Sequence, residues 1–290
     1  MFKPKRSILL FVDNSISDKV LGACGLCKGG ELLKFDAETT KLLEIAYQGA
    51  ELTRRRQASF DALCPAPGET ILDIGCGNGM LTVELARAVG SDGYIIGIDP
   101  SADMTAAARE RGSDYANVEF RAGAANSLPI EDESADKAVS VQVFEYIEDV
   151  DGALADTLRC VKPGGRLVIS DLHFGSLIWF SDEPDRMQKM LTSWNQHFVS
   201  GSVPERLPAL IKARGDHVED VLSFTMTDHQ LKPDGLAIMM MHLIQQYAVA
   251  NDHVDPTVAQ SWFDEQHSLA KVGRFFFSMT QFIVVVRKKG

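Results

Sequence analysis

The chain has 290 residues but lacks any long apolar run, which excludes a membrane-spanning helix. Its apolar stretches, such as Phe282 to Val286, fall far short of the roughly 18 residues that a span requires. Near the N-terminus, the basic segment Lys3 to Arg6 precedes only five apolar residues, Ile8 to Val12, whereas a secretory signal needs roughly 7–15. We therefore expect a cytoplasmic protein with no membrane partner.

Cysteine is scarce as well, and its spacing excludes the common metal sites. The five cysteines show no disulfide framework, which suits a reducing compartment. Cys24 and Cys27 form a lone C-x-x-C pair without the second pair that a structural zinc site needs. A cluster of three closely spaced cysteines, which an iron–sulfur radical enzyme requires, is also missing. We expect no metal centre.

Basic residues are outnumbered by acidic ones. Lysine and arginine total 29 against 40 aspartates and glutamates, giving a net charge of −11. Proteins that bind a phosphate backbone usually carry a basic face, so we expect no nucleic-acid partner. The run Arg54 to Arg56 is more typical of a solvated helix face. A homodimer formed through an exchanged N-terminal segment is an open alternative.

The middle of the chain shows strands alternating with helices, which predicts a doubly wound, Rossmann-like parallel sheet. In such sheets a ligand lies at the carboxyl ends of the strands. Those ends include Gly75, Asp99, Gly123, Gln142 and Asp171. The expected strands are 70–74, 94–99, 118–122, 136–142 and 166–171, and the expected helices are 80–89, 101–111 and 149–161.

A glycine-rich turn follows the first expected strand, in the sequence Ile71-Leu-Asp-Ile-Gly-Cys-Gly-Asn-Gly79. Glycines at 75, 77 and 79 let the backbone turn tightly and let a ligand approach it, because no Cβ intervenes. Asp99 ends the next strand, 24 residues after Gly75, where its carboxylate can accept both hydroxyls of a ribose. The pattern predicts a nucleoside site.

The spacing departs from the G-x-G-x-x-G pattern of dinucleotide sites, and Asp73 faces the same turn. A fixed carboxylate beside two phosphates would be repulsive. It suits a nucleoside that lacks phosphate and carries positive charge, and S-adenosylmethionine, with its sulfonium and ammonium groups, fits. A nicotinamide dinucleotide is the alternative that this spacing opposes.

The remaining segments lie before and after the alternating strands and helices. We expect an N-terminal arm at 1–36 and a catalytic domain at 37–290, with leading helices at 37–64 and cap or insert segments at 174–215 and 230–272. Within them, patterns predict a strand at 218–224, helices at 233–250 and 256–271, and a final strand at 275–287 that is apolar on both faces. Trp179, Phe180, Trp194 and Phe198 form either a lid over an apolar substrate or core.

Five ordered motifs carry a resemblance to class I S-adenosylmethionine-dependent methyltransferases, in the branch of the ubiquinone and menaquinone C-methyltransferases. They are Leu72-Asp-Ile-Gly-Cys-Gly-Asn-Gly79, Gly97-Ile-Asp-Pro-Ser101, Leu128-Pro-Ile-Glu-Asp-Glu-Ser-Ala-Asp136, Val143-Phe-Glu-Tyr146 and Val161-Lys-Pro-Gly-Gly-Arg166. The resemblance implies a seven-stranded sheet whose last strand inserts antiparallel between two others. It also implies methyl transfer to a small molecule.

The resemblance also implies roles for particular residues. Asp73 would face the ammonium of the cofactor, Asp99 its ribose, and Tyr47 with Arg55 its carboxylate. Ala124 stands where the family often has an aspartate for the adenine, so Asn126 or a backbone carbonyl would substitute. The full implied cofactor set is Tyr47, Arg55, Asp73, Gly75, Cys76, Gly77, Asn78, Gly79, Asp99, Pro100, Met104, Ala124, Ala125, Asn126, Gln142, Val143 and Phe144.

The chemistry limits what else is needed. Methyl transfer from a sulfonium mainly requires positioning, and a base is needed only when the acceptor atom is protonated. His173, two residues beyond the fifth strand, is the first candidate base, oriented by Asp171; Glu145 and Tyr146 are next. We expect a small, largely apolar acceptor reacting at O, N or C. An RNA or protein methyltransferase and a non-catalytic cofactor-binding protein are the alternatives.

Overall fold

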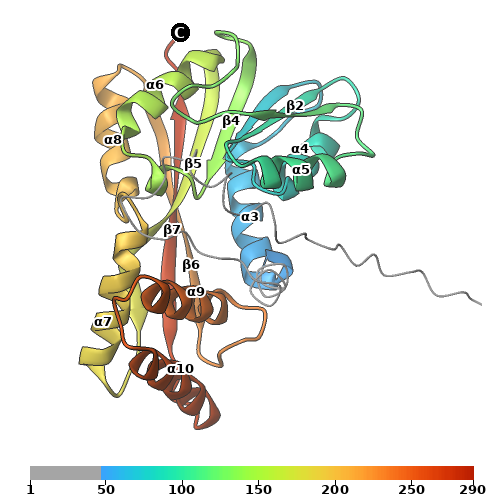
Figure 1. The fold of residues 1–290 in the computed structure, drawn as a ribbon. Coiled ribbons are helices and arrows are strands. Elements are labelled where there is room, and N and C mark those ends of the chain that lie inside the picture. Colours follow the sequence, from blue (N-terminus) through green and yellow to red (C-terminus); the bar gives the residue numbers. More distant parts are fainter. Residues whose placement is uncertain (1–46) are drawn as a thin grey trace, which may run out of the picture.

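A computed structural model describes residues 47–290 of the protein (Figure 1). The predicted N-terminal arm and the Cys24–Cys27 pair lie outside the described residues. The strands are β1 (Thr70–Ile74), β2 (Tyr94–Asp99), β3 (Val118–Ala122), β4 (Ala135–Val141), β5 (Val161–Trp179), β6 (His217–Asp228) and β7 (Phe277–Arg287). The helices are α3 (Ala50–Leu63), α4 (Met80–Val89), α5 (Ala102–Arg111), α6 (Val150–Cys160), α7 (Pro184–Trp194), α8 (Val203–Ala213), α9 (Leu236–Ala250) and α10 (Pro256–Lys271), with 3-10 turns η2 (Phe144–Tyr146) and η3 (Asn195–His197).

The strands form one seven-stranded sheet in the order β3-β2-β1-β4-β5-β7-β6. The pairs among β1 to β5 are parallel, while β7 runs antiparallel to both of its neighbours, β5 and β6. The predicted doubly wound sheet with an inserted antiparallel last strand is therefore confirmed. Strand order reverses between β1 and β4, where such sheets place their ligands.

Helices cover both faces of this sheet, so its central strands are buried on both sides. One core lies under α6 and α8 and includes Leu72, Leu154 and Leu207. The other lies under α3 and α4 and includes Ile71, Leu63 and Leu85. Ile71 and Leu72, which are neighbours in β1, thus pack into cores on opposite faces of the sheet, and this explains why apolar residues follow one another in that strand.

Capping side chains start two of these helices, at the residues where the sequence predicts that the helices begin. The Ser101 hydroxyl accepts a hydrogen bond from the Met104 N–H at 3.3 Å and begins α5. Asp149 accepts from the Gly152 N–H at 2.8 Å and begins α6. Ser101 follows the carboxyl end of β2 and Asp149 follows η2, so each cap fixes a loop that comes after a strand.

The sheet continues as a helix-covered extension. We define the extension as β5 beyond Ser170, the parts of β6 and β7 that pair there, and helices α7, α9 and α10. Pairing of β5 with β4 ends at Ser170, after which β5 pairs with β7 alone as far as Trp179. Figure 1 shows α9 and α10 beside the far ends of β6 and β7. The register of β5 against β7 is irregular between His173 and Ile178.

Three expectations need correction in this region. The fifth strand was expected at 166–171 but spans Val161–Trp179, because β7 offers a partner far beyond the end of β4. Helix α7 had no predicted counterpart within 174–204. Trp179 and Trp194 are 9% and 4% exposed in the extension's core, so they do not form a lid. Helix α8 packs on the sheet itself, against β5, β6 and β7.

Within residues 47–290, no helix combines the length and the apolar character needed to cross a bilayer.

Candidate cofactor site

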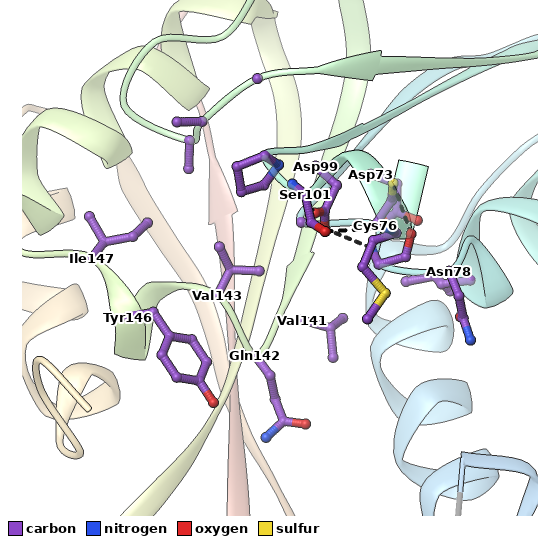
Figure 2. A pocket seen from close by; sticks show the side chains of 18 of the residues that line it. Asp73, Cys76, Asn78, Asp99, Ser101, Val141, Gln142, Val143, Tyr146 and Ile147 are labelled. Carbon is purple, nitrogen blue, oxygen red and sulfur yellow. Dashed lines mark hydrogen bonds between the residues drawn. The ribbon is translucent and has the colours of Figure 1, made fainter. Parts of the chain in front are cut away.

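A cavity of about 800 Å³ opens at the carboxyl ends of β1, β2 and β4, with α3 on its other side. It contains most of the residues predicted for the cofactor, some of which are drawn in Figure 2. Those lining it are Tyr47, Arg55, Asp73, Gly75, Cys76, Gly77, Asn78, Asp99, Pro100, Met104, Ala124, Ala125, Asn126, Gln142 and Val143. Gly79 and Phe144 do not line it: Gly79 precedes α4, and Phe144 is fully buried.

The glycine loop adopts the backbone that only glycine accepts readily. Gly75, Gly77 and Gly79 have φ angles of +68°, +53° and +78°. A Cβ at Gly75 would also overlap the Val143 side chain. The N–H groups of Gly75 and Cys76 donate to the Ile98 carbonyl at 2.7 and 3.0 Å. The loop is thereby held against the end of β2, open toward the cavity.

Asp99 is anchored by the backbone on two sides. Its Oδ2 accepts from the Gly77 N–H and its Oδ1 from the Ser101 N–H, each at 2.9 Å. Burial raises the pKa of Asp99, and the two N–H donors oppose that rise. A carboxylate has about four acceptor positions, so this fixed group retains capacity for two ligand hydroxyls.

Asp73 lies deeper and holds the start of α4. Its Oδ2 accepts from the Thr82 hydroxyl at 2.6 Å, and the side chain is 2% exposed. Burial raises the pKa of Asp73 to about 7, and the Thr82 hydrogen bond opposes this shift. A cationic ligand group nearby would favour its ionised form.

Gln142 leaves β4 in a strained conformation, with φ at +56°. Its N–H donates to the Ser170 carbonyl at 2.8 Å, and the next N–H, of Val143, donates to Asp171 Oδ1 at 3.0 Å. Burial raises the pKa of Asp171 to about 7, although backbone N–H donors oppose the rise. Asp171 therefore secures the turn after β4; it does not hydrogen-bond His173 among the contacts of the described residues.

A buried charge cluster lies behind this turn. Arg55 of α3 and Glu145 of η2 are 5% and 0% exposed. Arg55 Nε and Nη1 and both Glu145 carboxylate oxygens make no hydrogen bond of ordinary geometry within residues 47–290. Burial, then Asp171, raises the pKa of Glu145 well above its usual value, while Arg55, Tyr146 and Gln142 oppose the shift. Arg55 and Tyr146 reach the cavity wall, and Glu145 lies behind it.

The structure places His173 away from the cavity, so its position argues against the predicted role as base. Its side chain projects from β5 to the face that carries Phe282, and its Nε2 pairs with Glu205 of α8. Alternation keeps His173 on the face of Asp171, but His173 lies farther along β5, past the last residue that pairs with β4, where it meets Glu205 of α8 instead of the cavity. Of the three predicted catalytic residues, only Tyr146 lines the cavity.

Sequence reasoning also missed part of the cavity wall. Leu52, Met80, Ile147 and Asp149 line it but belong to no quoted motif, and Ser101 lines it although the predicted cofactor set omits it. The cap chemistry of Ser101 and Asp149 could have placed both at strand ends. Among the described residues, no group of three or more histidine, cysteine or acidic side chains is arranged to hold a metal ion.

Comparison with known proteins gives a consistent picture. A family model described as "Methyltransferase domain" matches residues 65–234. An uncharacterised 37.1 kDa protein of a transposon in Streptomyces fradiae is 31% identical, covering 80% of this chain and 66% of that protein. An arsenite methyltransferase of Halobacterium salinarum is 34% identical over 64% of this chain and 46% of its own length. A demethylmenaquinone methyltransferase of Desulfitobacterium hafniense is 39% identical over 40% of this chain and 47% of its own length.

The chain thus spans between 46% and 66% of the length of these curated relatives. Among solved structures, the YcgJ protein of Bacillus subtilis superposes with a TM-score of 0.59 at 17% identity, covering 82% of this chain and 99% of that one. The [4+2]-cyclase SpnF superposes with a TM-score of 0.53 at 20% identity, covering 93% and 90%. These likenesses support the fold, and a cyclase among them shows that the fold alone does not fix a reaction.

Proposed function

Because the chain belongs to the class I S-adenosylmethionine-dependent methyltransferases, we propose that it transfers the methyl group of that cofactor to a small, largely apolar acceptor. The observation that carries the proposal is the 800 Å³ cavity, in which Asp73, the glycine loop and Asp99 face one space. Its volume lies toward the upper end of the roughly 300–1,000 Å³ typical of small-molecule sites. This leaves room for an acceptor beside the nucleoside.

The residues present fit the cofactor group by group. Asp99 supplies the acceptor positions for a ribose, and a Cβ at Gly77 would meet no protein atom within 4 Å, so the loop backbone there is open to a ligand. Asp73 offers a buried carboxylate for a cationic group, while Arg55 presents buried N–H donors without protein partners in the described part of the chain. Two opposite charges at separate places match a ligand with an ammonium and a carboxylate.

When bound, S-adenosylmethionine supplies a methyl group already activated by its sulfonium. The chain's own contribution is therefore to bind, to orient and to exclude water. Asp99 and the glycine loop would fix the nucleoside, and Val143 would set the closest approach on the acceptor side. Gln142 would line the cofactor's methionine part, and Tyr146, which also lines the cavity, would face the acceptor. The net charge of −11 supports a small molecule over RNA as the acceptor.

Calorimetric titration with S-adenosylhomocysteine tests the cofactor assignment. We expect micromolar binding to the wild type and to the control Asp103→Ala, which changes an exposed residue of α5. Asp99→Ala should lose roughly 10- to 100-fold, as expected for hydrogen bonds to a charged group. Binding of NADH in place of the homocysteine nucleoside would refute the proposal.

The acceptor class is tested separately with cofactor carrying a labelled methyl group. The enzyme is incubated with a small-molecule extract, total RNA and a protein fraction in parallel. Label in the organic-extractable fraction supports the proposal. Label only in acid-precipitable RNA or protein would replace it with the macromolecular alternative.

A further inference from the structure

One residue of the cavity wall belongs to the core of the extension. Leu52 of α3 lines the cavity, is 1% exposed and packs within the apolar cluster that α7, α9 and α10 cover. Within residues 47–290, none of the other residues that line the cavity belongs to that cluster. The cavity and the extension therefore share a wall at Leu52.

Hydrogen bonds before and after Leu52 fix the position of α3. Glu51, the preceding residue, accepts from the Leu236 N–H at the start of α9 at 3.1 Å. Two turns after Leu52, the Ser59 hydroxyl accepts from Gln281 Nε2 of β7 at 3.3 Å. Leu52 thus lies between the start of α9 and the strand β7.

Two methionines of the sheet lie in the same place. Met279 is two residues from Gln281 and therefore on the same face of β7, the face that α3 covers. It pairs with Met226 of β6, and both methionines are buried in the cluster that contains Leu52. The Leu52 side chain therefore has the cavity on one side and a methionine-containing core on the other.

Methionine is concentrated in this core. Seven of the chain's ten methionines are buried there, namely Met187, Met190, Met226, Met239, Met240, Met241 and Met279. The two cores on the faces of the parallel strands contain none. Methionine is unbranched and adapts to irregular gaps, so a core rich in it rearranges more readily than one built from branched side chains. The wall at Leu52 is therefore backed by the most adaptable apolar core of the described chain.

We propose that Leu52 determines which apolar substituent the acceptor can carry, and that the wall formed by Leu52, Met226 and Met279 yields to larger substituents. The inference rests on the proposed function and specifies its acceptor, a compound with an alkyl or aryl group that lies against Leu52. Leu52 belongs neither to the glycine loop nor to the acidic residues that would fix the nucleoside. Its effect is therefore on the acceptor and not on the cofactor.

Binding of n-alkylbenzenes, from toluene to butylbenzene, tests how this wall responds. The titrations use calorimetry and the complex of the full chain with S-adenosylhomocysteine. For the wild type we expect affinity to rise about fourfold with each added methylene, the usual gain for burying one. Leu52→Ala should bind butylbenzene roughly 10- to 50-fold more tightly, because about three carbons of wall are removed. Leu52→Trp should bind toluene but not butylbenzene.

A double variant tests the yielding of the wall directly. Met226→Leu combined with Met279→Leu conserves volume but replaces flexible side chains with branched ones. We expect its affinity for toluene to stay within about twofold and its affinity for butylbenzene to fall about tenfold. Met190→Leu, in α7 of the same core, is the matched control and should change neither affinity. These variants decide the question even if Leu52→Ala does not fold.

Methyl transfer supplies a second measurement that a purely structural role of Leu52 would not change. With labelled cofactor and a small-molecule extract, the products of Leu52→Ala should shift to larger masses than those of the wild type. The products of Leu52→Trp should shift to smaller masses. Affinity for S-adenosylhomocysteine should stay within about twofold in both variants.

The proposal is overturned if the wild-type complex binds no alkylbenzene, or if Leu52→Ala shows the same dependence on chain length as the wild type. Product masses that do not respond to residue 52, or equal losses for toluene and butylbenzene in the double variant, would also overturn it. In each case, S-adenosylhomocysteine binding and labelled small-molecule products would leave the proposed function standing. If the wild type does not bind the homocysteine nucleoside, the proposed function itself has failed.

Discussion

The parallel half of the sheet, β1 to β4 with α4 to α6, and the extension differ in what their sequences must satisfy. The parallel half depends on single atoms at fixed places: the missing Cβ of Gly75 and the Asp99 carboxylate between two N–H groups. The extension depends on volume, since Trp179, Trp262 and Phe277 pack edge to face with centroids 4.9 and 5.6 Å apart. A ligand site tolerates few residues per position, whereas a core tolerates many.

Trp262→Ala should give the largest effect and tests whether the two regions are separable. Trp262 is fully buried, and its indole N–H points to Met187 Sδ at 3.3 Å. We expect a loss of about 3–5 kcal/mol in the free energy of unfolding, measured with urea. Affinity for S-adenosylhomocysteine should stay within about twofold below the unfolding transition. Phe276→Ala, at a 40% exposed position nearby, should change stability by about 0.5 kcal/mol or less.

Gly75→Ala should act on both stability and ligand binding. Overpacking against Val143 costs about 1–3 kcal/mol and the left-handed backbone about 1–2 more. Gly68→Ala measures the cost of the left-handed backbone alone, because Gly68 has φ at +83° and an added Cβ would meet no atom within 4 Å. Adding Val143→Ala should restore part of the stability of Gly75→Ala. Equal losses in Gly75→Ala and Gly68→Ala would show that the close approach does not matter.

Asp73 should make the free protein less stable as pH rises. Its pKa is raised by burial from 3.8 to about 7, so the folded state holds a proton that the unfolded chain has lost in this window. The stabilisation is present below about pH 4 and declines until about pH 7. Between pH 4 and pH 8 the free energy of unfolding should therefore fall by roughly 2–4 kcal/mol less in Asp73→Asn than in the wild type. Parallel urea denaturation curves for the two proteins would contradict this.

Glu51→Gln should have the smallest effect and addresses the junction between the regions. Glu51 of α3 is 3% exposed, and its oxygens accept from Lys232 Nζ at 2.6 Å and from the Leu236 N–H at 3.1 Å. It caps α9, which has no side-chain cap of its own. We expect a loss of about 1–2 kcal/mol and faster amide exchange in the first turn of α9. Unchanged exchange there would show that the cap is dispensable.

The sequence predicted the parallel half in detail, because each element there has a local marker. The glycine loop and the Asp99 position predicted a nucleoside site, and the residues of both line one cavity. The extension had no such marker: Pro184 opens α7 without a capping side chain, and β5 continues only because β7 lies beside it. Long-range pairing, which extends β5 beyond β4 and carries His173 to Glu205 of α8, cannot be obtained from a single local pattern.

The register irregularity between His173 and Ile178 marks a natural boundary for recombination. Up to His173, the side chains of β5 alternate between the two faces of the seven-stranded sheet. From Ile178 on, they alternate in a register set by β7 and the extension's core. An insertion or deletion at this point shifts neither alternation, because the mismatch is already absorbed there. Changes of length in this stretch therefore leave undisturbed the turn that Asp171 holds.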